Sequence, residues 1–256
     1  MISKPQLISL TTDFGTRDFR TGALQACILK HAPNVQFVDL SHEIPVFDLV
    51  QAAFMIKNGY PFFPHESIHL AWVFNAGEDN GILLAYFESC YFILPDNGLL
   101  NMICDEQSPE YILRISEDCY QYRERIAAAV FQISSGEDMM ALYDKLENPV
   151  RKINVSPVYQ KDRIQTKVSY IDRYGNLIMN IMKEPFNKIA AGRSFSFHTK
   201  THDVISHFTT DEVLPVNGGF YLYFSDAGFM TLALCGSHAA TTLDIHVDDN
   251  LQIIFE

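Results

Sequence analysis

An α/β N-terminal domain with a mostly parallel sheet, followed by a smaller all-β, barrel-like domain, is predicted by three features of this 256-residue chain. Up to about residue 150, apolar strand patterns alternate with helical patterns across short links, which is typical of a layered α/β architecture. Several of these strands are near-continuous apolar runs, as in strands that are buried on both faces. Beyond that point, short strands separated by Gly, Asn and Asp turns favour a small barrel or sandwich. We therefore place the domains at residues 1–150 and 165–256, with 151–164 as a linker.

The chain opens with a strand, a tight turn and a helix. An apolar run at 7–10 ends in the letters TTDFG, and a helical pattern continues through residue 28. Asp13 therefore follows the C-terminal end of a strand, and in open α/β sheets ligands bind in the crevice outside those ends. Asp13 and Asp18 bracket the turn and are short acceptors suited to sugar hydroxyls or an ammonium group. The alternative is that Asp13 caps the following helix by accepting its first free N–H groups.

The remaining elements follow from hydrophobic periodicity and turn signals. In the N-terminal domain we expect strands at residues 35–40, 67–74, 81–87, 90–94 and 112–115, and helices at 48–58, 123–133 and 138–146. Gly59 stands where a glycine commonly ends a helix, and the letters PDNG at 95–98 are a strong turn signal. In the C-terminal domain we expect strands at residues 167–171, 177–181, 194–198, 219–224, 230–234 and 252–255.

The net charge and the cysteine content indicate which partners and which cellular compartment to expect for this protein. The formal net charge of −12 argues against a nucleic-acid surface, because phosphate contacts need clustered Lys and Arg, whereas an acidic cleft would attract a cationic small molecule. The five cysteines contain no CxxC pair, which fits reduced thiols. The first residues lack the pattern of a signal peptide, and no apolar run approaches the ~20 residues of a membrane helix. We expect a cytoplasmic protein with neither nucleic acid nor membrane as a partner.

Further polar clusters lie in the second half of the chain. Asp172 and Asn176 flank a turn between two predicted strands, where Asp172 could bind a ligand ammonium and Asn176 the edge of a heterocycle. The alternative is a side-chain turn within a hairpin. Ser225, together with the letters GSHAA at 236–240, offers donors and acceptors that could line a pocket.

Histidines provide a weaker signal. The spacing of His198, His202 and His207 could hold a metal, but no Cys or carboxylate cluster accompanies them, so we expect no metal site. His42 and His69 stand beside predicted strands, and we expect hydrogen-bonded core or rim positions for both.

The order of motifs resembles a known family. The letters TTDFG, DLSHEI, IHLA, PDNGLL, YIDRYGNLIMNI and GSHAA occur in the order found in the S-adenosylmethionine (SAM) hydroxide adenosyltransferase family, which is related to SAM-dependent fluorinases and chlorinases. The resemblance covers nearly the whole chain. It implies an α/β domain, a smaller β domain and a homotrimer in which SAM lies between the N-terminal domain of one subunit and the C-terminal domain of its neighbour. It also implies hydrolysis of SAM to adenosine and methionine, with SAM as substrate or ligand and no further cofactor.

The resemblance assigns roles to individual residues. Asp13 is similar to the aspartate that binds the ribose diol, with Phe14 beside it in the same motif. The remaining assignments are Asp18 and Asp172 near the methionine amino group, Ser225 near its carboxylate, and Asn176 at the adenine edge. Charge-assisted hydrogen bonds to an ammonium or a diol are of the strong kind, so the assigned side chains suit these groups.

The hydrolases of this family position the attacking water with an Asp, Arg and His triad, and this chain departs from it. The resemblance places Asn75 at the aspartate, Ile82 or a neighbour at the arginine and Gln121 at the histidine. A neutral amide is not a useful base and Ile82 binds no water, so we assign no catalytic residue. Losing residues that act as a unit costs about 10³-fold or more in rate.

Two functions from different classes therefore stay open. The first is a SAM hydrolase-like protein in which Glu78, Asp79 or Glu124 supplies a compensating base, although each is also typical of a solvated surface carboxylate. The second is a catalytically silent protein that binds or senses SAM or adenosine on the same scaffold. An enzyme that uses the pocket for another substrate is a third possibility, because a fold does not fix function.

Overall fold

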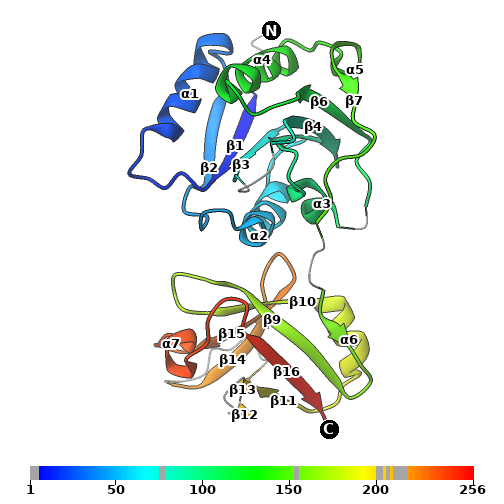
Figure 1. The fold of residues 1–256 in the computed structure, drawn as a ribbon. Helices are drawn as coiled ribbons and strands as arrows, with labels where there is room; N and C mark the ends of the chain where they lie inside the picture. The colour runs from blue at the N-terminus through cyan, green and yellow to red at the C-terminus, as the bar shows by residue number, and fades with distance from the viewer. Residues whose placement is uncertain are drawn as a thin grey trace. The chain divides into compact units, whose positions relative to one another are not determined.

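The computed structural model describes residues 6–74, 79–105, 107–152, 156–199, 204–205, 208–209 and 218–256. The chain forms two compact units, Met1–Asn154 and Val155–Glu256, which we describe one at a time (Figure 1). Within the described residues, no helix has both the length and the apolar character needed to cross a membrane.

The first unit is built on a sheet whose described strands have the order β2-β1-β3-β5-β4-β6-β7. Its strands are β1 (Leu7–Thr12), β2 (Gln36–Ser41), β3 (Ile68–Trp72), β4 (Ile82–Phe87), β5 (Cys90–Pro95), β6 (Tyr111–Ser116) and β7 (Asp144–Lys145). The pairs among β2, β1, β3 and β5 are parallel, whereas β4 pairs antiparallel with β5 and β6, and β6 with β7. The sheet is therefore mixed, and the prediction of a mostly parallel sheet is wrong.

The reason is the link between β4 and β5. Only Glu88 and Ser89 separate these strands, and both have positive φ, at 48° and 61°. Two-residue hairpins favour turns with positive φ at both central positions, and a link this short can join only antiparallel neighbours.

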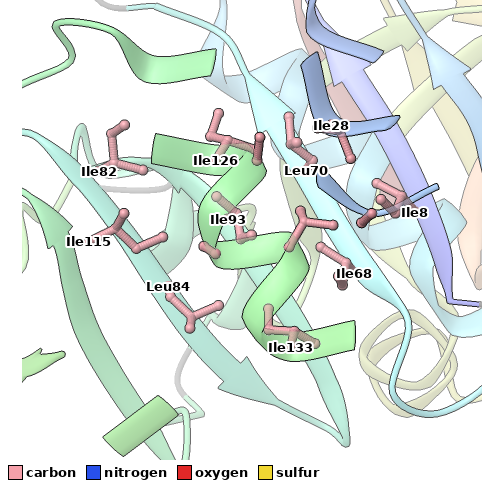
Figure 2. Packing of buried hydrophobic residues seen from close by; sticks show 14 of the residues in the cluster. Ile8, Ile28, Ile68, Leu70, Ile82, Leu84, Ile93, Ile115, Ile126 and Ile133 are labelled. Atoms are coloured by element: carbon pink, nitrogen blue, oxygen red, sulfur yellow. The ribbon is translucent and has the colours of Figure 1, made fainter. Parts of the chain in front are cut away.

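Helices cover both faces of this sheet. They are α1 (Arg20–His31), α2 (Leu49–Gly59), the short 3-10 helix η1 (Tyr60–Phe62), α3 (Leu99–Cys104), α4 (Tyr122–Ser134) and α5 (Met139–Leu142). Leu70 and Trp72 of β3 pack in a cluster with α1 and α4, while the alternating Ala71 and Val73 pack in a cluster with α2 and α3. Figure 2 shows residues of the first cluster, where isoleucines and leucines of the strands face α4. Strands covered on both faces explain the near-continuous apolar runs.

His69 and His42 are hydrogen-bonded and buried, as predicted. The Nδ1 atom of His69 lies 2.7 Å from Ser9 Oγ, and that of His42 lies 2.8 Å from Thr12 Oγ1. Aromatic rings surround His69, with the Phe63 ring edge-on at 5.1 Å between centroids. Burial lowers the pKa of His69 from 6.5 to about 4.

This burial predicts a pH-dependent stability. Because the unfolded chain protonates His69 below pH 6.5 and the folded chain does so only near pH 4, the stabilising effect of a neutral ring is complete above pH 6.5 and is lost between pH 6.5 and 4. The loss amounts to about 3 kcal/mol of unfolding free energy. Urea unfolding at pH 7.5 and pH 4.5 should therefore show a smaller difference in His69→Gln than in the parent. His246→Gln is the matched control, because His246 is exposed, and it should show the same pH difference as the parent. An equal pH effect in His69→Gln and the parent would contradict the assignment.

The second unit carries a curled, largely antiparallel sheet. Its described strands have the order β12-β11-β16-β9-β10-β15-β14-β13, with β8 paired to β9 and only the β13–β14 pair parallel. The strands are β8 (Val158–Tyr159), β9 (Arg163–Ile171), β10 (Leu177–Met182), β11 (Phe195–His198), β12 (Val204–Ile205), β13 (Phe208–Thr209), β14 (Phe220–Phe224), β15 (Phe229–Leu234) and β16 (Asn250–Phe255). Two short helices, α6 (Lys183–Ala190) and α7 (Ala239–Leu243), accompany them, so the unit is not purely β. Within the described part of the chain, the strands at the two ends of this order, β12 and β13, do not pair with each other. The sheet is therefore an open half-barrel (Figure 1).

Candidate functional site

Asp13 follows directly after β1 and links three segments of the first unit. Its backbone N–H donates to the Trp72 carbonyl at 3.4 Å, and its Oδ2 accepts from the N–H groups of Phe47 and Phe74 at 3.5 and 3.4 Å. These bonds are long and therefore weak, so the carboxylate can accept stronger bonds from a ligand. Burial raises the pKa of Asp13, while the two backbone donors and the charge of Arg20 act in the opposite direction. Asp13 does not cap α1, because that helix begins only at Arg20.

The Asp18 carboxylate already forms a hydrogen bond and an ion pair with Arg20. Its Oδ1 accepts from the backbone N–H of Arg20 at 3.0 Å, and its Oδ2 pairs with the Arg20 guanidinium. Burial raises the pKa of both Asp13 and Tyr122, and the positive charge of the same guanidinium partly offsets this rise in each. Arg20 therefore brings positive charge to the side of the turn where the sequence predicts an ammonium ligand.

The turn between β1 and α1 forms an open hollow of about 910 Å³. Residues 14–19 and Glu43 line it. The Glu43 carboxylate fixes the loop by accepting from Thr16 N and Thr16 Oγ1 at 3.1 and 2.9 Å. Gly15, at φ +70°, donates its N–H to the His42 carbonyl at 2.7 Å. The size of the hollow is within the range of ligand pockets.

An aromatic pair adjoins Asp13. The rings of Trp72 and Tyr122 stack with centroids 4.2 Å apart and 17° between their planes. Trp72 ends β3 and Tyr122 begins α4, so the stack ties the first turn of α4 to the edge of the sheet where Asp13 lies. Gln121, immediately before Tyr122, is exposed and has φ 52°. The structure thus brings Asp13, Asp18 and Gln121 to one edge of the sheet.

In the second unit, Asp172 and Asn176 lie together in the turn between β9 and β10. The Asp172 carboxylate accepts from the backbone N–H groups of Tyr174 and Asn176, both at 2.9 Å, and from Asn176 Nδ2 at 2.8 Å. This is the side-chain turn that the sequence analysis gave as the alternative. Gly175, at φ +77°, contacts His238 so closely that a Cβ would lie 2.6 Å from its ring nitrogen. The GSHAA segment at 236–240 therefore packs against this turn.

Ser225 lies apart from Asp172 and Asn176. It begins the turn between β14 and β15, and its Oγ accepts from Phe229 N at 3.2 Å. In the β10–β15 pair, Phe229 lies opposite Met182 whereas Leu232 lies opposite Leu177. The Ser225 turn and the Asp172 turn are therefore at opposite ends of this strand pair. For the histidine cluster, His198 Nε2 lies 3.0 Å from Ser196 Oγ, while His202 and His207 are outside the described residues.

Comparison with known proteins now identifies the family. The family model described as the SAM hydroxide adenosyltransferase N-terminal domain matches residues 8–143, and the model for the C-terminal domain matches residues 166–252. The chain belongs to the SAM hydroxide adenosyltransferase family. This confirms the resemblance noted in the sequence.

Curated relatives agree with this membership. A protein named (R)-S-adenosyl-L-methionine hydrolase from Methanocaldococcus jannaschii is 26% identical, with 97% of this chain and 96% of that protein aligned. A Salinispora arenicola protein of the same name is 21% identical, with 96% and 97% aligned. Among solved structures, an uncharacterised conserved protein from Thermotoga maritima superposes with a TM-score of 0.87 at 20% identity, over 96% of this chain and 99% of that one. At that identity the structural likeness shows the fold alone.

The structure describes part of the region in which the resemblance places a catalytic triad. Asn75 and Glu78 lie outside the described residues. Ile82 is fully buried in β4 within the core cluster that includes Ile115 and Ile126 (Figure 2). It faces the core and does not line the hollow.

Two of the carboxylates considered as compensating bases have structural partners. Asp79 accepts from Cys119 N at 2.8 and 3.0 Å and from Gly81 N at 3.1 Å, and the Cys119 bond lowers the pKa of Asp79. A carboxylate held in this way ties two loops together and is a poor base. Glu124 accepts a bond from the thiol of Cys27 at 3.1 Å.

Trp72 and Tyr122 were not predicted from the sequence as site residues. The signal that could have found them is that Trp72, the one tryptophan of the chain, ends a buried strand next to β1, the strand that Asp13 follows.

Proposed function

We propose that this protein is SAM hydrolase-like: it binds SAM and converts SAM and water to adenosine and methionine. The observation that carries the proposal is the half-buried Asp13 carboxylate at the ends of β1 and β3, in a chain that matches both domains of the family. In this reaction the water oxygen attacks C5′ of the ribose, the C5′–S bond breaks, methionine leaves as a neutral thioether and one proton is released. Holding the water in line with C5′ supplies much of the rate of such a displacement.

Asp13 is proposed to accept bonds from both ribose hydroxyls, with Phe14 beside the sugar. Asp172 and Asn176 are proposed to bind the methionine amino group and the adenine edge. The resemblance also gives Ser225 to the methionine carboxylate, but its turn lies at the opposite end of the β10–β15 pair from Asp172, so we do not propose that role. Because Asp172 and Asn176 bond to each other in this structure, ligand binding would exchange the bond between Asn176 Nδ2 and Asp172 Oδ2 for bonds to the ligand. We also propose the homotrimer that the resemblance implies, which light scattering on the purified protein would test.

The second candidate function is a catalytically silent protein that binds or senses SAM or adenosine. It is favoured by the buried side chain of Ile82, by the neutral Gln121 and by the structural partners of Asp79 and Glu124. Among the described residues near the triad positions, each carboxylate considered as a base already accepts bonds from the protein.

One experiment separates the two functions. Purified protein is incubated with SAM while adenosine release is followed by chromatography, and binding of SAM and adenosine is measured in parallel by calorimetry. Release of adenosine and methionine in equal amounts supports the hydrolase. Binding without release supports the silent protein, and absence of binding by both ligands refutes both.

Arg20 provides a prediction about ligand charge. SAM carries a positively charged sulfonium and a positively charged ammonium, so the Arg20 guanidinium repels it. Arg20 also forms an ion pair with Asp18, which competes with binding of the ammonium there. We expect Arg20→Gln to bind SAM about tenfold more tightly, which corresponds to roughly 1.4 kcal/mol, while the affinity for neutral adenosine stays nearly constant. Arg17→Gln is the matched control, because Arg17 lines the same hollow but Asp18 pairs with Arg20. Weaker SAM binding in Arg20→Gln, or an equal change for adenosine, would contradict the prediction.

A further inference from the structure

A cluster of potential metal ligands lies between α1 and α4, apart from the residues assigned to SAM. Cys27 and His31 are four residues apart on α1 and so share one face of that helix. Glu124 comes from the first turn of α4. One ligand atom from each of the three side chains lies within 4.8 Å of the other two.

The hydrogen bonds within the cluster suit a metal. The His31 Nδ1 atom lies 3.1 Å from the Cys27 carbonyl, and because a carbonyl only accepts, Nδ1 carries the hydrogen and Nε2 keeps its lone pair. Metal-bound histidines commonly have such a carbonyl partner, which fixes the tautomer and the ring. The Cys27 thiol donates to Glu124 Oε2 at 3.1 Å, so a cation could replace this single proton between the sulfur and the carboxylate.

Charge and exposure agree with this arrangement. A divalent cation would displace the thiol proton, and the resulting thiolate and carboxylate would together neutralise its charge. Cys27 is buried but His31 and Glu124 are exposed, which leaves a solvent side from which an ion can enter and a water can complete the coordination.

We propose that Cys27, His31 and Glu124 bind a divalent transition metal of the zinc class and that the ion joins α1 to α4. Thiolate, imidazole and carboxylate are the ligands zinc uses in proteins, and three protein ligands with one water is a common zinc arrangement. Glu124 lies two residues after Tyr122, which stacks on Trp72, so the ion would hold the turn of α4 that borders the candidate site. This proposal goes beyond the proposed function and revises the expectation that the chain has no metal site.

The test uses the full chain after treatment with a chelator, titrated with Co²⁺ and then with Zn²⁺. We expect one Co²⁺ per chain, a thiolate-to-cobalt charge-transfer band, release of a proton, and loss of the band when Zn²⁺ displaces cobalt. Zn²⁺ in 100-fold excess over its Kd should raise Tm by roughly 5 °C. Absence of the band, or a Tm that Zn²⁺ does not change, would overturn the proposal.

Variants assign the ligands. Cys27→Ser should abolish the charge-transfer band, and His31→Gln and Glu124→Gln should each weaken cobalt binding at least tenfold. The matched control is Cys235→Ser, which removes a thiol from the other unit and should leave the band unchanged. Because His31 is exposed, His31→Gln tests the site even where Cys27→Ser fails to fold. Undiminished cobalt binding in folded His31→Gln, or a band that survives in Cys27→Ser, refutes the site.

Discussion

Asp13→Ala is expected to weaken adenosine binding by about 100-fold. In the proposed site the carboxylate accepts two hydrogen bonds from the ribose diol, and a bond to a charged group contributes about 1.5–3 kcal/mol. Two such bonds exceed the roughly 2.7 kcal/mol that correspond to a factor of 100. Asp13→Asn keeps an acceptor oxygen but loses the charge, so we expect a smaller loss of about tenfold. Calorimetric titration with adenosine measures both.

The structure supplies the controls for this experiment. The protein hydrogen bonds of Asp13 Oδ2 are 3.4–3.5 Å long, so their loss should change the unfolding free energy little, and circular dichroism can verify the fold. Asp138→Asn removes a carboxylate from the same unit and keeps the N-cap of α5, because asparagine caps as well as aspartate. Its affinity should equal that of the parent. Unchanged adenosine affinity in Asp13→Ala would remove the ribose assignment.

Much of the first unit could be predicted because buried strands appear in the sequence as runs of mostly apolar residues. The run at 67–74 is apolar apart from Ser67 and His69, since β3 packs one set of alternate side chains toward α1 and α4 and the other toward α2 and α3. Whether neighbouring strands run parallel or antiparallel was harder to predict from the sequence. The two residues between the runs at 81–87 and 90–94 were sufficient to indicate a hairpin, but the alternation of strands and helices elsewhere favoured parallel pairing.

The candidate site was less predictable because a carboxylate's role depends on its nearest partners. Asp18 and Asp172 both have the residue type that an ammonium site requires, yet Arg20 pairs with the first and a local turn engages the second. Trp72 and Tyr122 are fifty positions apart, and no local pattern indicates that their rings stack. Only Asp13, at the end of a buried strand, combines a predictable place with a carboxylate that has only weak partners.

Ile82→Arg is expected to destabilise the first unit by about 4 kcal/mol or more. Because Ile82 is fully buried among apolar side chains, a guanidinium there would be a buried charge without a partner. Urea unfolding measures the loss. Ile82→Met is the matched control, since it has a similar length but no charge and should cost less than about 1.5 kcal/mol.

The same prediction decides how the hydrolase triad can be tested in this chain. Gln121 is exposed and has a φ of 52° that histidine tolerates, so Gln121→His should change the unfolding free energy by no more than about 0.5 kcal/mol. A gain in adenosine release from Gln121→His would therefore report on chemistry, whereas lost activity in Ile82→Arg would report on folding. If Ile82→Arg is as stable as the parent and releases adenosine faster, then position 82 faces the site and its placement in the core is wrong. If Ile82 does lie in the core, an arginine that completes the triad must be introduced at another position, one whose side chain can reach the hollow lined by residues 14–19 and Glu43.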